Sequence, residues 1–265
     1  MKRVLTVQDL SCVGRCSLTV ALPVLSAMGI QAAALPTAVL STHTAFANPE
    51  VVSLTGSLIP FANHWKDRGI DFDAISVGYL SDPRQAEAVL EIAESFDCPL
   101  ILDPVMGDSG RLYSRITREH IEAMKRLCAK AEVVLPNVTE AAFLTGSEYR
   151  AEPEEKDLAE LAGKLLALGA KHVLITGVKW DADTIGWYYT DGSISHKGCN
   201  LYIPRNFHGT GDLFAAVFCG DYVNRKDIPA AAEKAAEFVR RCVAATENVT
   251  PFGVEFEKDL PFLHS

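Results

Sequence analysis

Short runs of β-branched and other apolar residues alternate with segments of helical periodicity along most of this 265-residue chain. Six runs are predicted strands: Arg3–Gln8, Gln31–Leu35, Ala74–Val77, Leu100–Leu102, Val133–Leu135 and His172–Ile175. The predicted helices are Ser17–Met28, Pro83–Ser95, Thr117–Leu127, Leu158–Leu168, Gly211–Asn224 and Ile228–Thr246. A repeated strand–helix–strand pattern predicts right-handed crossovers. We therefore expect an α/β fold of three layers, with a mostly parallel central sheet covered by helices on both faces.

The end of the sheet has a different pattern. Ile185–Tyr189 and Ser193–Lys197 flank Asp191-Gly192, a dipeptide typical of a tight hairpin turn. This predicts antiparallel strands at one edge of the sheet. The chain contains no Ser/Gly-rich linker and no internal repeat, so we expect residues 1–265 to form a single domain.

Charge and composition exclude several classes of partner. A formal net charge of −9 argues against DNA or RNA, because nucleic-acid binding depends on basic contacts to phosphates. No apolar stretch reaches the ~18 residues of a membrane span, and the N-terminus lacks a signal-peptide pattern. Seven cysteines without a Cys-x-x-Cys pair favour a reducing compartment. We therefore expect a cytoplasmic protein that binds neither nucleic acid nor membrane.

The segment Gly209-Thr210-Gly211-Asp212 opens a predicted helix. Two glycines permit a tight turn, and the free N–H groups at a helix N-terminus form an anion site. A carboxylate at this place, Asp212, can accept a proton from a substrate hydroxyl while the N–H groups of Gly209–Gly211 hold the transferred phosphoryl group. The alternative is that Asp212 is an ordinary helix cap.

Two further polar segments follow strands, where ligands bind in open α/β sheets. Asp103 and Asp108 lie in a Pro/Gly loop after Leu100–Leu102, where carboxylates can hold magnesium directly or through water. The alternative is an Asp-Pro turn without a metal. Asn137 and Glu140 follow the next strand with the spacing of a helix capping box.

Taken in chain order, these motifs resemble those of ribokinase-like kinases. Asp-Pro-Val-Met-Gly from Asp103, Pro-Asn-x-x-Glu from Pro136 and Gly-Thr-Gly-Asp from Gly209 are similar to segments of the vitamin B6 and hydroxymethylpyrimidine kinases. The resemblance implies that Asp212 is the catalytic base. It also implies that Asp103, Asn137, Glu140 and Thr176 contact ATP, with Asp103 and Glu140 near Mg²⁺. A monovalent cation such as K⁺ and a homodimer are common in this family.

The substrate residues are read from the same resemblance. The stretch Thr37–Phe46 is similar to one in pyridoxal kinases, with the match carried by Ser41, His43 and Thr44. A hydroxyl and an imidazole can hydrogen-bond the substituents of a pyridine ring, and an aromatic side chain can stack on it. Tyr79 lies in a segment similar to Ser-Gly-Tyr-Leu of these kinases. A polar loop and ordinary core packing are the alternatives.

One position departs from the family pattern. Pyridoxal kinases usually have a serine at the end of the first strand, and this chain has Asp9. Asp9 can pair with a protonated ring nitrogen or accept from the phenolic group, or it can indicate a different substrate. Gly14 matches the family's glycine before the first helix.

The resemblance implies ATP-dependent phosphorylation of the 5′-hydroxymethyl group of pyridoxal, pyridoxamine or pyridoxine. A hydroxymethylpyrimidine kinase is the main alternative, followed by a sugar kinase and a non-catalytic pyridoxal-binding protein. A dinucleotide-dependent oxidoreductase is disfavoured because no Gly-x-Gly-x-x-Gly follows the first strand. The adenine-binding residues cannot be assigned from the sequence, since Cys199–Asn206 contains no recognisable motif.

Overall fold

The computed structural model describes residues 1–264 and places nine strands in one sheet, in the order β11-β10-β9-β8-β5-β4-β1-β2-β3. These strands are β1 (Arg3–Ser11), β2 (Gln31–Leu40), β3 (Val51–Ser53), β4 (Ala74–Val77), β5 (Leu100–Leu102), β8 (Val133–Val134), β9 (His172–Lys179), β10 (Thr184–Thr190) and β11 (Ser195–Leu201). The strands from β2 to β9 in this order run parallel, whereas β3 at one edge and β10 and β11 at the other pair antiparallel with their neighbours. The predicted parallel sheet and its antiparallel edge are confirmed.

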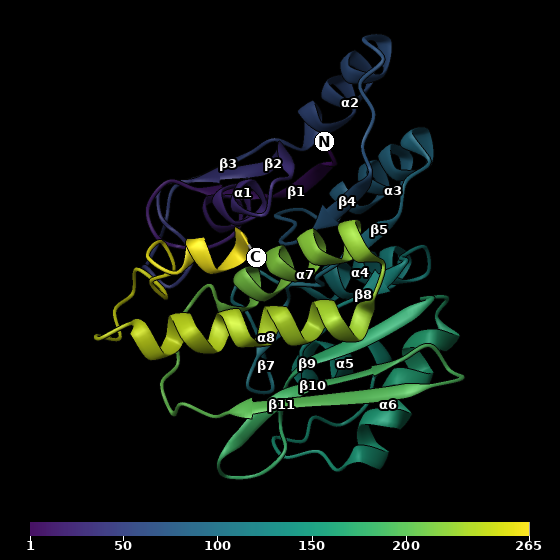
Figure 1. The fold of residues 1–265 in the computed structure, drawn as a ribbon. Coiled ribbons are helices and arrows are strands. Elements are labelled where there is room, and N and C mark those ends of the chain that lie inside the picture. The colour runs from purple at the N-terminus through teal and green to yellow at the C-terminus, as the bar shows by residue number, and fades with distance from the viewer. Residues whose placement is uncertain (265) are drawn as a thin grey trace.

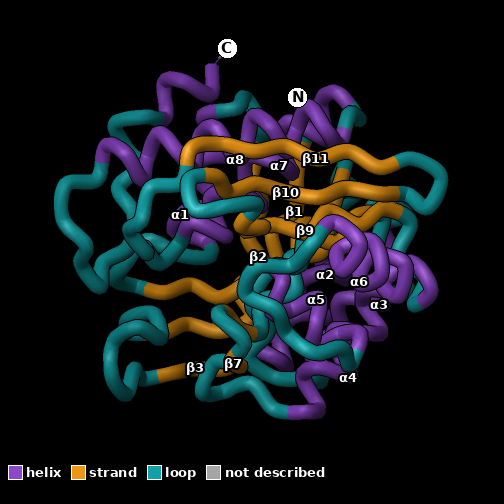
Figure 2. Tube along the Cα trace, turned by 90° about the horizontal axis from the view of Figure 1, so that it is seen from below, coloured by secondary structure: helices purple, strands orange, loops and turns teal. Residues whose placement is uncertain are grey.

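Helices cover both faces of this sheet (Figure 1). One face carries α1 (Leu18–Ala27), α7 (Thr210–Arg225) and α8 (Ile228–Ala245). The other carries α2 (Leu58–Asp67), α3 (Gln85–Phe96), α4 (Arg118–Cys128), α5 (Val138–Thr145) and α6 (Glu155–Ala167). Figure 2 shows the strands as a layer between α7 and α8 on one side and α3, α4 and α6 on the other. The predicted three-layer arrangement is confirmed.

The alternating direction of side chains along each strand divides the core into two halves, one on each face of the sheet. In β1, Val4 packs under α1 and α7, whereas Leu5 and Val7 pack against the opposite helices. Successive side chains of a strand point to opposite faces of a sheet, so an unbroken apolar run supplies both halves at once. This is why the central strands read as continuous apolar runs rather than as alternating patterns. Since all nine strands share this sheet, we propose that residues 1–265 form one domain.

Helix α2, the edge strand β3 and a small hairpin formed by β6 (Gly107–Asp108) and β7 (Arg111–Leu112) were not predicted from the sequence, and α5 was indicated only by its capping box. Helix α2 buries only Leu58 and Ala62, and β3 is mostly exposed, so neither has a strong apolar period. In contrast, α5 buries six of its eight residues and lacks a polar face.

Three predicted strands are longer than expected, which changes the position of two candidate residues. Strand β1 continues to Ser11, so Asp9 lies within it, and β2 continues to Leu40. Strand β9 continues to Lys179, so Thr176 lies within it rather than at its end. Backbone pairing with β10 keeps β9 extended past the point where its apolar run ends.

No helix within residues 1–264 is long and apolar enough to cross a membrane.

Candidate active site

The carboxyl ends of β5 and β8, the middle of β9 and the start of α7 surround a cavity of about 390 Å³. All predicted catalytic and phosphate-binding residues line it: Asp103, Asn137, Glu140, Thr176, Gly209, Thr210, Gly211 and Asp212. They come from four separate segments of the chain. The parallel sheet brings these segments together because its strands end at the same edge.

The first turn of α7 forms the anion-binding part of this cavity. Gly209 is the N-cap, with a φ of 84°, in the left-handed region that glycine adopts without strain. A Cβ at Gly209 would lie 2.1 Å from the carbonyl oxygen of Arg15, so only glycine fits there. The first N–H groups of a helix have no partner within the helix. In this 16-residue helix they therefore offer a site for a phosphate group.

Asp212 lies in the same turn and is half-buried. Burial raises its pKa to about 7, and the negative charge of Asp9 acts in the same direction. The nearby backbone N–H of Ser17 opposes this rise. A carboxylate with a pKa near neutrality has the basicity that a general base needs.

Asp103 and Glu140 form a second acidic group that lines the same cavity. Glu140 is buried, and its two oxygens accept from the N–H of Met106 at 3.0 Å and of Asn137 at 2.9 Å. Burial raises the pKa of Asp103, and the neighbouring charges of Glu140 and Asp212 raise it further. This excess of negative charge fits a divalent cation, and carboxylate oxygens are the ligands that magnesium prefers. Asp103 and Glu140 are the residues that would hold it.

Asn137 has the predicted capping role. Its side-chain oxygen accepts from the N–H of Glu140 at 2.9 Å, which completes the capping box of α5. Its side-chain nitrogen donates to the carbonyl oxygen of Gly107, also at 2.9 Å. Thr176 lies beside it, because the two residues form an isolated parallel bridge.

The hairpin β6–β7 forms a wall that was not predicted. Its turn has positive φ at Ser109 and Gly110, which is the geometry of a tight hairpin turn. Asp108 and Tyr113 at its two ends line the cavity. The sequence signal was Asp-Ser-Gly between two very short runs.

The apolar part of the cavity was also missed. It is formed by the segment after β11, by one residue of α7 and by one face of α8; these residues are Tyr202, Ile203 and Arg205, then Phe214, and then Ala236, Val239 and Val243. Ala236, Val239 and Val243 have helical spacing, the one signal that could have identified this face. Arg205 holds the segment in place by donating to the carbonyl oxygens of Thr246 and Val243.

Asp9 lies near Asp212, and Tyr79 lies near Asp9, but neither residue lines the cavity. Asp9 is buried within β1, where burial raises its pKa. Its two oxygens accept from Ser17 Oγ at 2.5 Å and Ser11 Oγ at 2.9 Å. Burial and the charge of Asp9 raise the pKa of Tyr79, which places this phenol near the same carboxylate. The cluster supplies acceptors and one donor for a polar ring.

The loop after β2 is arranged differently. Nε2 of buried His43 lies 2.6 Å from the carbonyl oxygen of Pro251, and Nδ1 accepts from the N–H of Ala45 at 3.3 Å. A carbonyl oxygen only accepts, so Nε2 carries the proton and both nitrogens are engaged by the backbone. Ser41 and Thr44 are exposed, and Ser41 Oγ accepts from the N–H of Glu50. None of these three residues lines the cavity.

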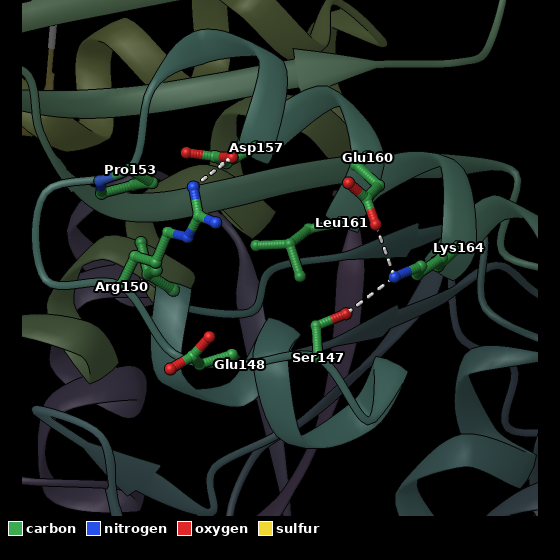
Figure 3. Close-up of a pocket in the computed structure, with 9 residues that line it drawn as sticks. Ser147, Glu148, Arg150, Pro153, Asp157, Glu160, Leu161 and Lys164 are labelled. Carbon is green, nitrogen blue, oxygen red and sulfur yellow. Dashed lines mark hydrogen bonds and ion pairs between the residues drawn. The ribbon is translucent and has the colours of Figure 1, made fainter.

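A smaller cavity of about 170 Å³ lies between α5 and α6 (Figure 3). Its basic side chains are already paired. Arg150 forms an ion pair with Asp157 at 2.8 Å, and Lys164 pairs with Glu160 at 2.7 Å. We therefore assign no ligand to this cavity.

A family model described as phosphomethylpyrimidine kinase matches residues 21–254. A hydroxymethylpyrimidine/phosphomethylpyrimidine kinase of Streptomyces coelicolor is 34% identical over 66% of this chain and 64% of its own length. The matched region thus spans less than two thirds of that relative.

Two solved structures match almost the whole chain. A pyridoxal kinase from Lactobacillus plantarum is 34% identical, with a TM-score of 0.90 over 99% of this chain and 96% of its own. A Bacteroides thetaiotaomicron structure, named as a phosphomethylpyrimidine kinase and solved in a form with pyridoxal, is 35% identical, with a TM-score of 0.93 over 99% of this chain and 95% of its own.

Proposed function

The chain belongs to the phosphomethylpyrimidine kinase family, and from this membership we propose that it is an ATP-dependent kinase that phosphorylates the 5′-hydroxymethyl group of pyridoxal and related B6 vitamers. One observation carries the proposal. Asp212, with its raised pKa, lies in the helix turn that can bind a phosphate, in the same cavity as the Asp103 and Glu140 carboxylates. This arrangement supports phosphoryl transfer to an alcohol rather than ligand binding alone.

The reaction follows from these positions. Asp212 accepts the proton of the substrate hydroxyl. The hydroxyl oxygen of the substrate then forms a bond to the γ-phosphorus of ATP, and the bond between the γ-phosphorus and the oxygen that links it to ADP breaks. The N–H groups of Gly209–Gly211 hold the equatorial phosphoryl oxygens. When bound at Asp103 and Glu140, magnesium supplies charge neutralisation on the phosphates. The apolar face of α8 receives the adenine ring, because it borders the same cavity.

Two observations favour the B6 vitamers as the proposed substrates. Among the structural matches that cover 99% of this chain are a pyridoxal kinase and a protein that is named as a phosphomethylpyrimidine kinase but was solved in a form with pyridoxal. In addition, Asp9 lies near Asp212 and Tyr79 lies near Asp9, so the two side chains can bind the ring nitrogen and the phenolic oxygen of pyridoxal. His43 supports this site by holding the loop after β2 against Pro251, with Ser41 and Thr44 as the further loop residues to test.

A hydroxymethylpyrimidine kinase is the second candidate, favoured by the family model and by the Streptomyces relative. Its substrate also carries a hydroxymethyl group on a nitrogen heterocycle, so the same machinery would serve. A homodimer, a cytoplasmic location and an assisting monovalent cation stay predictions from the resemblance.

The test is a substrate panel. Purified protein with ATP and Mg²⁺ is offered pyridoxal, pyridoxamine, pyridoxine and hydroxymethylpyrimidine, and the phosphorylated products are identified by mass spectrometry. We expect the highest kcat/KM with a B6 vitamer. A higher value for hydroxymethylpyrimidine would select the second candidate, and no product from any of the four would reject the kinase.

A further inference from the structure

Ser17 has a backbone conformation that serine rarely adopts. It is the residue before α1, with φ of 50° and ψ of −129°, and it is buried. Glycine would adopt this conformation freely, whereas a side chain makes it costly. Residues held in such conformations cluster at functional sites, where the surrounding structure over-determines them.

The side chain of Ser17 does not perform the usual task of a serine at this place. A serine at a helix N-cap normally accepts from the N–H two or three residues later, but Ser17 makes no such bond. Instead its Oγ donates to Asp9 Oδ1 at 2.5 Å. Helix capping therefore does not explain why a serine stands here.

The backbone of Ser17 approaches the other acid of the site. Its N–H lies close enough to the carboxylate of Asp212 to oppose the rise in the pKa of that group. Ser17 therefore lies between two carboxylates, with its side chain bonded to Asp9 on β1 and its backbone near Asp212 on α7.

The loop before α1 has little freedom to move. The carbonyl oxygen of Arg15 touches Gly209 so closely that no Cβ fits between them. The N–H of Arg15 donates to the carbonyl oxygen of Phe252 at 2.9 Å. The loop is therefore fixed against both the phosphate-binding turn and the C-terminal segment, and Ser17 lies at its end.

We propose that Ser17 is a positioning residue: its hydrogen bond to Asp9, together with the packing of its loop against Gly209, fixes this substrate-binding carboxylate relative to Asp212. The inference rests on the proposed function, since it assigns a role in the same site. It adds the N-cap residue of α1 to the machinery that sequence motifs assign to α7 and the strand ends.

Two substitutions separate the role of the Ser17 hydroxyl from that of its backbone conformation. Ser17→Ala removes the hydroxyl and keeps the strained backbone, and we expect kcat to fall about tenfold with the KM for ATP unchanged, the effect of one hydrogen bond to a charged group. Ser17→Gly also releases the backbone, so we expect a larger loss of kcat at an equal or higher melting temperature. Ser26→Ala, an exposed serine of the same helix, is the matched control and should behave as wild type. Active-site concentration is fixed by titration with a non-hydrolysable ATP analogue.

A double-mutant cycle tests the connection to Asp9. In an Asp9→Ala background, Ser17→Ala should cost less than about twofold in kcat, because its hydroxyl has lost its partner. Three outcomes would each overturn the proposal. They are a tenfold loss of kcat on Ser17→Ala in that background, a kcat within about twofold of wild type for both Ser17→Ala and Ser17→Gly, and losses of activity that follow the melting temperature. These ratios refer to whichever substrate the wild type phosphorylates, so a wrong vitamer would refute the proposed function and leave this test intact.

Discussion

At the scale of single residues, the properties of Asp212 come from its neighbours. Its position at a helix N-terminus would favour the charged form. Burial and the nearby charge of Asp9 outweigh this effect and raise its pKa to about 7. A carboxylate that would be fully ionised in water thus becomes a stronger base at neutral pH.

Replacing Asp212 by Asn should lower kcat by about 10²–10⁴, because the proton acceptor is lost while the phosphate-binding N–H groups remain. Affinity for ATP should be nearly unchanged, as measured by calorimetry. A variant with near-normal turnover would show that Asp212 is not the base.

The same substitution should raise the melting temperature at pH 8. Since the pKa of Asp212 is higher in the folded state than its ordinary value of 3.8, ionising it destabilises the fold as pH rises between about 4 and 7. The neutral Asn variant lacks this loss of stability. Calorimetric scans at pH 5 and pH 8 measure the difference, which should be larger at pH 8.

The pH profile of kcat/KM for the vitamin should rise through about pH 7, as Asp212 loses its proton. Asp9→Asn removes a neighbouring negative charge and should therefore shift this acid limb to lower pH. Steady-state rates between pH 5 and 9 measure both profiles. If the acid limb of the Asp9→Asn profile lies at the same pH as that of the wild type, the charge of Asp9 does not raise the pKa of Asp212.

At the scale of elements, the first turn of α5 holds the β6–β7 hairpin over the site. Asn137 donates to Gly107 at 2.9 Å, Glu140 accepts from Met106 at 3.0 Å, and Thr139 Oγ1 accepts from Gly110 at 3.0 Å. The hairpin has only two residues in each strand, and such a ribbon is not stable alone. Its position therefore depends on these three contacts.

Replacing Thr139 by Val keeps the volume of the side chain but leaves the N–H of Gly110 without its acceptor. An unsatisfied N–H costs about 1–3 kcal/mol, so we expect faster amide exchange in residues 107–112 with the rest of the sheet unchanged. Hydrogen exchange with mass spectrometry measures this. Thr145→Val, at the other end of α5 and bonded to its own helix, is the control and should leave the hairpin protected.

At the scale of the whole molecule, segments from both ends of the chain meet at the phosphate-binding turn. The loop before α1 touches Gly209 through Arg15, and the N–H of Val254 donates to the carbonyl oxygen of His208 at 3.0 Å. The site therefore forms only when the first helix, α7 and the C-terminal segment are all packed.

A pair of glycines tests this close packing. Gly209→Ala would require a strained φ and a contact of 2.1 Å with Arg15, so we expect it to lower the free energy of unfolding by about 2 kcal/mol or more. Gly211→Ala meets no atom within 4 Å and lies in a helix, where alanine is favoured by about 0.5–1 kcal/mol. Urea denaturation measures both. Equal free energies of unfolding for the two variants would mean that the turn accommodates a Cβ at position 209 without loss of stability.

The sequence was informative about the site wherever chemistry is local. Gly209–Asp212, Asp103 and the Asn137–Glu140 capping box were predicted from spacing, and the structure brings all of them to one cavity. It was less informative about the loop after β2. The motif around His43 predicted substrate contact, but the protein backbone engages both ring nitrogens. The partner of an imidazole is chosen by a segment about 200 residues away, which no local pattern reveals.

By itself, the sequence determined the type and order of most elements and the phosphate-binding chemistry, because periodicity, turn residues and helix caps act over a few neighbouring positions. Only the tertiary structure decided which side chains meet. It placed the apolar face of α8 beside the phosphate site, brought the β6–β7 hairpin over it, and connected Asp9 to Asp212 through Ser17. Such contacts depend on the packing of helices from distant parts of the chain against one sheet, and that packing is a property of the whole core.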